Sequence, residues 1–212
     1  MNKEVVGRLE ALLEVLGATE LMPEVLRLYA EAKRTYKSVA TRLVTRPLTC
    51  AVAVACALSN RCVTTVEFVL RFLNRRSPDP DSVSAAKSLA RALASRIGLE
   101  PDYVTTKVFE MEVRAFCRSI GMDPRSEDCN KVVELSAALK SRLNYYSKSP
   151  ARIARNAYRA LLDLGIVGHR ARVRVKKKYT KLYWVALDVA RELFINRPRQ
   201  GASQGQQPSQ AS

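Results

Sequence analysis

The segment from Pro150 to Leu164 carries the side chains best suited to contact a nucleic acid. Its apolar residues recur at helical spacing, and Ser149 followed by proline is a typical helix start. Steps of three and four place a second set of side chains on the opposite face. Arginine and asparagine fit guanine and adenine edges, and an α-helix fits the major groove of DNA. The side chains predicted to face DNA bases are Arg152, Arg155, Asn156 and Arg159.

A second basic segment follows this helix. Over residues 170–176 basic residues alternate with apolar ones, which is typical of a β-strand. A turn at 177–180 and a returning strand over 182–187 would complete a β-hairpin. Residues 148–181 contain 11 basic residues and one acid. The residues predicted to contact phosphates are Lys148, Arg170, Arg172, Arg174, Lys176, Lys177, Lys178 and Lys181, beside Ser149 at the helix start.

The order of helix, Gly165-Ile166-Val167-Gly168 turn and hairpin resembles the winged helix-turn-helix family of DNA-binding proteins. In that family a recognition helix ends in such a turn, and a two-stranded wing with a cationic tip contacts the DNA backbone or minor groove. The resemblance covers residues 126–187, about 60 residues. It implies that Pro150–Leu164 is the recognition helix and that the lysines at 176–178 and 181 form the wing tip.

A second resemblance, to the cyclin-box repeats of the general transcription factor B family, covers residues 5–165. In those repeats a helix leads to a basic segment with proline and then to a buried Ala-rich helix. Residues 22–33 and 46–57 follow this pattern, and residues 135–143 and 148–158 repeat it about 100 residues later. The resemblance implies two five-helix units.

Catalytic and metal-binding motifs are missing from the sequence. There is one histidine, His169, and none of the five cysteines forms a Cys-x2-Cys pair. Glycine-rich phosphate loops and the G-x-S-x-G elbow are also missing. We therefore expect no enzyme, no catalytic residue, no metal site and no cofactor. The cysteines are expected in the core, with a Cys117–Cys129 disulfide left open.

Most of the chain has the apolar periodicity of helices, with prolines at their starts and glycines at their ends. The third predicted helix is apolar on every side and is expected to be buried. A break is expected at residues 77–81, with Asp81 or Ser82 as the next cap. The predicted helices cover residues 3–16, 23–44, 47–58, 65–73, 82–97, 105–120, 126–143 and 150–164, with a short terminal helix from Asp188 to about Phe194.

These elements predict a mainly α-helical fold in two parts. Residues 1–98 are expected to form a multi-helix domain. Residues 101–197 are expected to form a second helical domain that ends in a winged helix-turn-helix with one β-hairpin. Residues 198–212 consist mostly of Gln, Ser, Gly, Pro and Ala and are expected to be a disordered tail.

The formal net charge of +16 is unevenly distributed. Residues 165–199 contain 10 basic and 2 acidic residues, whereas residues 1–44 contain 7 and 6. Strong basic character points to a polyanionic partner, here double-stranded DNA. The nearly neutral N-terminal region is typical of a module that binds a second copy of the chain or another protein.

Arginine outnumbers lysine 24 to 12, and all five glutamines lie in the last 13 residues. Such depletion of thermolabile amides is typical of thermophiles and favours an archaeal or viral source. No apolar run approaches the roughly 20 residues of a membrane helix, and the first residues lack a signal-peptide pattern. We therefore expect an intracellular, cytoplasmic protein without a membrane partner.

The sequence as a whole predicts a non-enzymatic DNA-binding protein of transcription regulation or replication. A double cyclin-box protein of the transcription factor B type is one alternative. An RNA-binding protein, a structural or packaging nucleoprotein and a nuclease are others. Aromatic residues, which single-strand binding favours, make up only 7% of the chain. A membrane-surface helix is disfavoured because alanines occupy the positions of the large apolar anchors.

Overall fold

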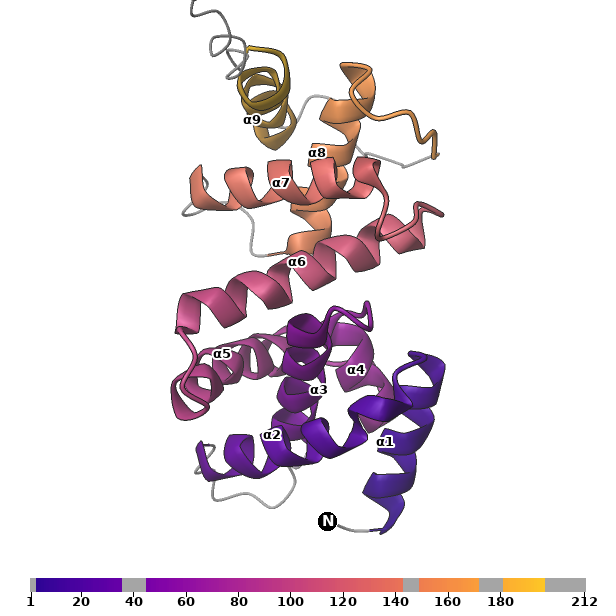
Figure 1. Ribbon diagram of the computed structural model, residues 1–212, viewed down its shortest axis with the longest axis vertical. Coiled ribbons are helices and arrows are strands. Elements are labelled where there is room, and N and C mark those ends of the chain that lie inside the picture. The colour runs from indigo at the N-terminus through magenta and orange to yellow at the C-terminus, as the bar shows by residue number, and fades with distance from the viewer. Residues whose placement is uncertain (1–2, 36–44, 143–148, 172–180, 197–212) are drawn as a thin grey trace, which may run out of the picture.

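The computed structural model describes residues 3–35, 45–142, 149–171 and 181–196. These residues are mainly helical, which confirms the predicted class, and none of them lies in a β-strand. The helices are stacked along the long axis of the molecule (Figure 1). Helices α1 to α5 lie at one end, α7 to α9 lie at the other, and α6 runs between them.

Helix α3 forms the centre of the N-terminal end. It contacts α2, α4, α5 and α6, and its residues from Pro47 to Ala57 are all buried, as its all-round apolar sequence predicts. The elements of this end are α1 (Lys3–Val15), the 3₁₀ turn η1 (Thr19–Leu21), α2 (Met22–Thr35), α3 (Thr45–Ser59), α4 (Val66–Asn74) and α5 (Pro80–Arg96).

Helix α6 (Pro101–Ser119) belongs to both hydrophobic cores of the protein. Val104 and Val108 pack into the core of the N-terminal end. Val113 and Phe116 pack into the core of the C-terminal end. The division into two domains stays a prediction, and α6 joins their cores through one continuous helix.

The C-terminal end is built around α8. Its elements are α7 (Glu127–Arg142), α8 (Pro150–Asp163), α9 (Lys181–Ala190) and a π-helical turn, η3 (Arg191–Ile195). Helix α8 contacts α6, α7 and α9. Its apolar face, which includes Ile153, Ala157 and Leu161, is buried in the second core.

The returning strand predicted over residues 182–187 is wrong, because these residues form the middle of α9. Their buried positions, Leu182, Tyr183, Ala186 and Leu187, follow helical spacing and pack α9 against its neighbours. Asp188 therefore lies inside a helix and caps none. The first strand and turn, predicted at 172–180, lie outside the described residues, and the preceding residues 166–171 have no regular structure.

Two helix starts differ from the sequence prediction. Helix α5 is capped by Asp79, whose carboxylate accepts a hydrogen bond of 2.7 Å from the Ser82 backbone N–H. Helix α6 begins at Pro101, before the predicted Thr105. In both cases proline occupies the first turn. The N–H groups of that turn have no acceptor within the helix, so the N–H that proline lacks costs no hydrogen bond. Helix α4 is capped by Thr65, whose hydroxyl accepts a hydrogen bond of 3.0 Å from the Phe68 backbone N–H.

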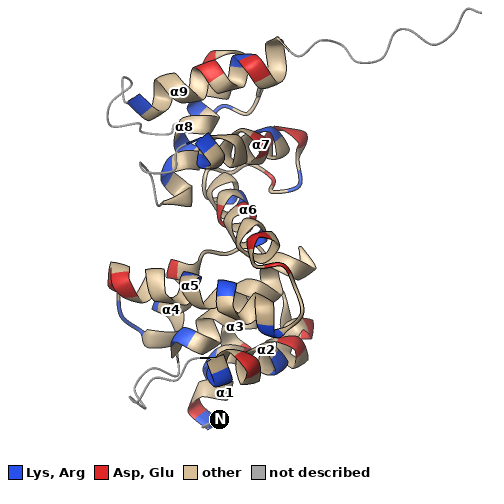
Figure 2. Cartoon of the chain, turned by 90° about the vertical axis from the view of Figure 1, so that its left-hand side faces the viewer, with Lys and Arg blue, Asp and Glu red and all other residues tan. Residues whose placement is uncertain are grey.

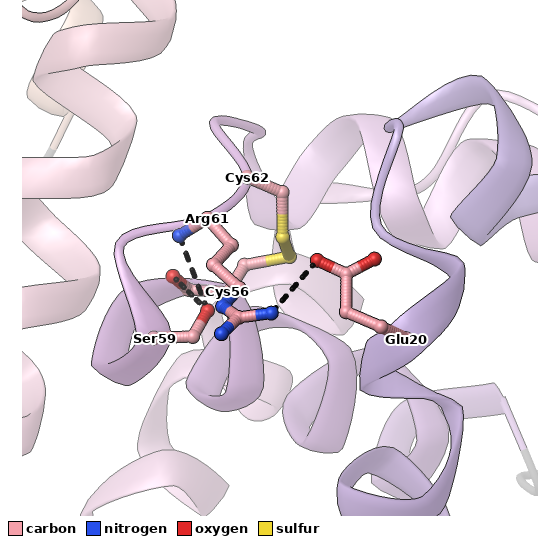
Figure 3. A network of polar contacts seen from close by, with 5 residues as sticks. All are labelled: Glu20, Cys56, Ser59, Arg61 and Cys62. Carbon is pink, nitrogen blue, oxygen red and sulfur yellow. Dashed lines mark hydrogen bonds and ion pairs between the residues drawn. A yellow bond between two sulfur atoms is a disulfide. The ribbon is translucent and has the colours of Figure 1, made fainter.

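The turn between α3 and α4 is closed by a disulfide between Cys56 and Cys62, whose Cα atoms are 5.0 Å apart (Figure 3). The Ser59 hydroxyl donates to Cys56 O in the same turn, and Arg61 forms an ion pair of 3.3 Å with Glu20. Three kinds of interaction therefore hold this turn.

The Cys117–Cys129 disulfide, which the sequence left open, is not formed in this structure. Both thiols are free and buried, and they share a hydrogen bond. The interaction with Cys129 and, after it, burial raise the pKa of Cys117, whereas Cys117 and the nearby Arg114 lower the pKa of Cys129.

In the part of the chain that the structure describes, no helix has both the length and the apolar character needed to cross a bilayer.

Candidate nucleic-acid interface

The exposed face of α8 carries two arginines. The buried face is set by Ile153, Ala154 and Ala157, and this leaves Arg152 and Arg155 exposed to solvent. Within the described ranges, neither guanidinium has an ion pair or a hydrogen bond. Both charges are therefore available to an external anion. Figure 2 shows several basic positions along α8.

Helix α8 starts at Pro150, where the sequence predicts, but the Ser149 side chain does not cap it. Ser149 occupies the N-cap position, but its side chain makes no capping hydrogen bond. The Ser149 carbonyl accepts the N–H groups of Arg152 at 3.0 Å and Ile153 at 3.1 Å. Pro150 supplies a first position without an N–H.

Asn156 does not face bases, so that prediction is wrong. Its side chain is buried, and Nδ2 donates a hydrogen bond of 2.8 Å to the Arg152 carbonyl one turn earlier. On the helical wheel Asn156 lies beside Ile153, at the edge of the apolar face. Its amide satisfies the backbone and is not presented to a ligand.

Arg159 is only half-buried, but its charge is compensated. Its guanidinium forms an ion pair of 3.0 Å with Asp163 on the same helix. Asp163 also accepts a hydrogen bond of 2.5 Å from the Tyr183 hydroxyl of α9. Arg159 therefore belongs to a link between α8 and α9. Of the four predicted base contacts, the structure leaves Arg152 and Arg155 exposed and unpaired among the described residues.

The chain after α8 is fixed by Asp128 of α7. Gly165 ends the helix in the left-handed region, with φ of 68°, where a residue without Cβ is least strained. The Asp128 carboxylate then accepts the backbone N–H groups of Gly168 at 2.9 Å and His169 at 3.0 Å. His169 Nε2 lies 3.0 Å from the Ile120 carbonyl, which accepts its hydrogen. The single histidine therefore has a structural role.

Tyr158 completes this anchor from inside the second core. Its buried hydroxyl donates to the His169 carbonyl at 2.7 Å and accepts from the Ala171 N–H at 2.8 Å. Arg170 lies between these two contacts and is exposed, without a partner for its side chain among the residues described. Sequence reasoning missed Tyr158 and Asp128, although a tyrosine at a core position signals a hydroxyl that needs a partner.

We call Arg152 and Arg155 the α8 face; Arg170 lies in the anchored segment that follows α8. Lys181, another predicted phosphate contact, is the exposed first residue of α9. The predicted contacts outside the described residues are Lys148, Arg172, Arg174, Lys176, Lys177 and Lys178.

A cavity of about 400 Å³ beside the disulfide also has basic walls, but most of their charges are used. Arg61 pairs with Glu20, Lys107 pairs with Glu110 at 2.9 Å, and Arg114 donates to the Pro124 carbonyl. This cavity is therefore a weaker anion site than the α8 face. Over the described ranges, no group of three His, Cys, Asp or Glu side chains is placed to hold a metal ion.

Comparison with known proteins gives no relative: no protein-family model, curated protein or solved structure matches the chain.

Proposed function

We propose that this chain is a non-enzymatic protein that binds duplex DNA through the α8 face and the basic segment that follows it, in transcription or replication. The observation that carries the proposal is the pair Arg152 and Arg155, exposed on α8 without partners among the described residues. Arginines on one helix face can donate to phosphates or to guanine edges in a major groove.

The anchored segment after α8 supports the same surface. Asp128 and Tyr158 hold residues 168–171 against the second core, and Arg170 extends from this fixed backbone. Residues 172–178 add five further positive charges to the chain at this point. A basic helix followed directly by a basic segment provides enough charge to neutralise several phosphates.

Because Asn156 is buried, α8 has fewer side chains that could recognise a specific DNA base. Without an exposed amide on α8, the bidentate contact to adenine is missing from this helix. Arg152 and Arg155 favour guanine or phosphate oxygen. We therefore expect most of the affinity to come from the phosphate backbone, with a modest preference for guanine.

The test is the salt dependence of binding to a duplex of about 20 base pairs, measured by fluorescence anisotropy. Each phosphate contact contributes about 0.9 to the slope of log K against log salt concentration, so six contacts cost about a thousandfold in affinity between 50 and 200 mM salt. R152Q/R155Q should reduce the slope by about 2.

The matched control is R27Q/R34Q, which removes the same formal charge from two arginines of α2 that pair with glutamates. This variant should keep the slope of the unmodified protein. A flat salt response, or equal loss in both variants, would refute the proposal. Displacement of the duplex by single-stranded RNA would favour the RNA-binding alternative, and metal-dependent cleavage of a plasmid would favour the nuclease.

The double cyclin-box alternative has one observation in its favour. Helix α3 follows α2 in the first core as α8 follows α7 in the second, and each second helix is central to its core. If the protein works in this way, tight duplex binding should require a second protein on the DNA. Tight binding by the purified chain alone favours the first proposal.

A further inference from the structure

The exposed side of α4 gathers three arginines and two phenylalanines. They follow the spacing of one helical face and its C-terminal end, and together with Ser77 they line a hollow of about 450 Å³. We call this set the α4 patch. Its residues are Phe68, Arg71, Phe72, Arg75 and Arg76.

The positive charge of the α4 patch is uncompensated. Its three arginines are exposed, and their side chains have no ion pair or hydrogen bond within the described chain. Two carboxylates from adjoining segments are used elsewhere: Asp79 binds Ser82, and Glu4 pairs with Arg8, which also donates to the Leu73 carbonyl of α4. Glu67, which is on α4 itself, lines a different hollow.

Arg75 occupies a position that normally selects glycine. It follows the last residue of α4 with φ of 55°, in the left-handed region. A side chain is disfavoured there by contact between Cβ and the carbonyl oxygen. A strained residue that is also an exposed, unpartnered arginine points to a ligand for its guanidinium.

The phenylalanines give the patch an aromatic surface among these charges. Phe68 is 40% exposed, and its ring centroid lies 6.1 Å from that of the half-buried Phe72. Phe68 also lines a second hollow of about 370 Å³, together with Val15, Leu16 and Arg118. Phe68 therefore borders two hollows, each with an arginine in its lining.

We propose that the α4 patch binds single-stranded nucleic acid, with an unpaired base stacked on Phe68 and phosphates held by the arginines. Exposed aromatic rings beside cationic side chains form the usual platform for unpaired bases, because every base offers a π-face. The same arginines beside a purely aliphatic surface would favour phosphate contact alone. This site goes beyond the duplex contact of α8 and does not depend on it.

The two sites lie on adjoining surfaces. A hollow of about 330 Å³ is lined by Pro78 and Pro80, which follow the patch, and by Ser149 and Pro150 at the start of α8. Both α4 and α8 lie toward the same side of the molecule in Figure 2. A nucleic acid with a duplex on α8 and an unpaired strand on α4 would pass this hollow, which is also lined by Lys87, its partner Glu112 and Glu67.

The experiment measures the anisotropy of a labelled oligodeoxythymidine of about 15 nucleotides and of an abasic phosphodiester of the same length. Phe68→Ala should weaken binding of the thymidine strand between about fivefold and a hundredfold, the effect of one stacked base. It should leave the abasic strand unaffected. Phe68→Leu, which keeps an apolar side chain but loses the ring, should behave like Phe68→Ala while retaining the melting temperature.

R71Q/R75Q/R76Q should weaken binding of both strands, because it removes phosphate contacts. The charge-matched control is R27Q/R34Q/R91Q, in which each arginine has a carboxylate partner, and it should weaken neither. R152Q/R155Q should bind the thymidine strand like the unmodified protein. The duplex proposal and this proposal can therefore fail separately.

Arg75→Gly gives an independent check. Glycine relieves the left-handed backbone, so the melting temperature should rise while the affinity for the thymidine strand falls. Unchanged affinity for thymidine in Phe68→Ala would overturn the proposal. Displacement of the thymidine strand by a polyglutamate peptide at equal charge would also overturn it, in favour of an acidic protein partner.

Discussion

Tyr158 and Asp128 together hold the backbone around Arg170. Tyr158→Phe removes the partner of the His169 carbonyl and of the Ala171 N–H while keeping the ring in the core. The loss of partners for such groups costs about 1–3 kcal/mol, so the free energy of unfolding in urea should fall by that amount. Tyr103→Phe, at a half-exposed ring, should change it little.

The cysteines give a second prediction at this scale. Denatured protein that has not been reduced should show three reactive thiols, because Cys56 and Cys62 are joined. In the folded protein, burial raises the pKa of Cys50 to about 12, so little of its thiolate exists near neutral pH and alkylation should be slow. Five thiols before reduction would contradict the disulfide.

Helical spacing alone did not show which of the four predicted base contacts on α8 would stay exposed. Asn156 lies beside Ile153 at the edge of the polar face and is buried. Arg159 lies on the polar face itself, but its guanidinium pairs with Asp163 one turn later. Arg152 and Arg155 are exposed on the same face. Long-range contacts, such as Tyr183 with Asp163, have no signal in local spacing.

Most helices could be predicted from apolar spacing, proline starts and glycine stops, because these signals are local. The α9 segment could not, because residues 182–187 are six consecutive apolar residues, and a short apolar run fits a strand or a buried helix equally well. The α4 patch was missed for another reason. Residues 66–82 contain three basic and three acidic residues, and only the structure shows that none of these acids pairs with an arginine of the patch.

The cap of α5 predicts a pH dependence. Hydrogen bonds from the Ser82 hydroxyl and N–H hold the pKa of Asp79 below its ordinary value of 3.8. A carboxylate with a depressed pKa in the folded state stabilises that state above its unfolded pKa, and the contribution is lost as the pH falls through the folded pKa. Asp79→Ala should therefore lower the melting temperature near pH 7 and have a smaller effect below about pH 3.

Asp81→Ala is the control for this cap. Asp81 lies in the first turn of the same helix, and its side chain has no hydrogen-bond partner among the described residues. Its removal should lower the melting temperature less at every pH. An equal effect of the two substitutions near pH 7 would show that charge at the helix start, rather than the Asp79 hydrogen bonds, stabilises α5.

At the scale of the whole molecule, the shared helix α6 predicts that both ends unfold together. Trp184 lies in the C-terminal end and Cys50 in the N-terminal core, so tryptophan fluorescence and alkylation of Cys50 report on different ends. Their midpoints in urea should coincide, as in a two-state transition. Separate midpoints would show that the two cores are independent.

The span of α6 across both cores also bears on how this protein can be dissected. A cut near residue 100 would remove Val104 and Val108 from the core of the first five helices. The N-terminal fragment would then expose the apolar surface that α6 covers. A cut after residue 119 would instead deprive α7 and α8 of Val113 and Phe116. Neither end therefore keeps a complete hydrophobic core when it is separated from the other. Functional assays on isolated halves would measure fragments with disrupted cores.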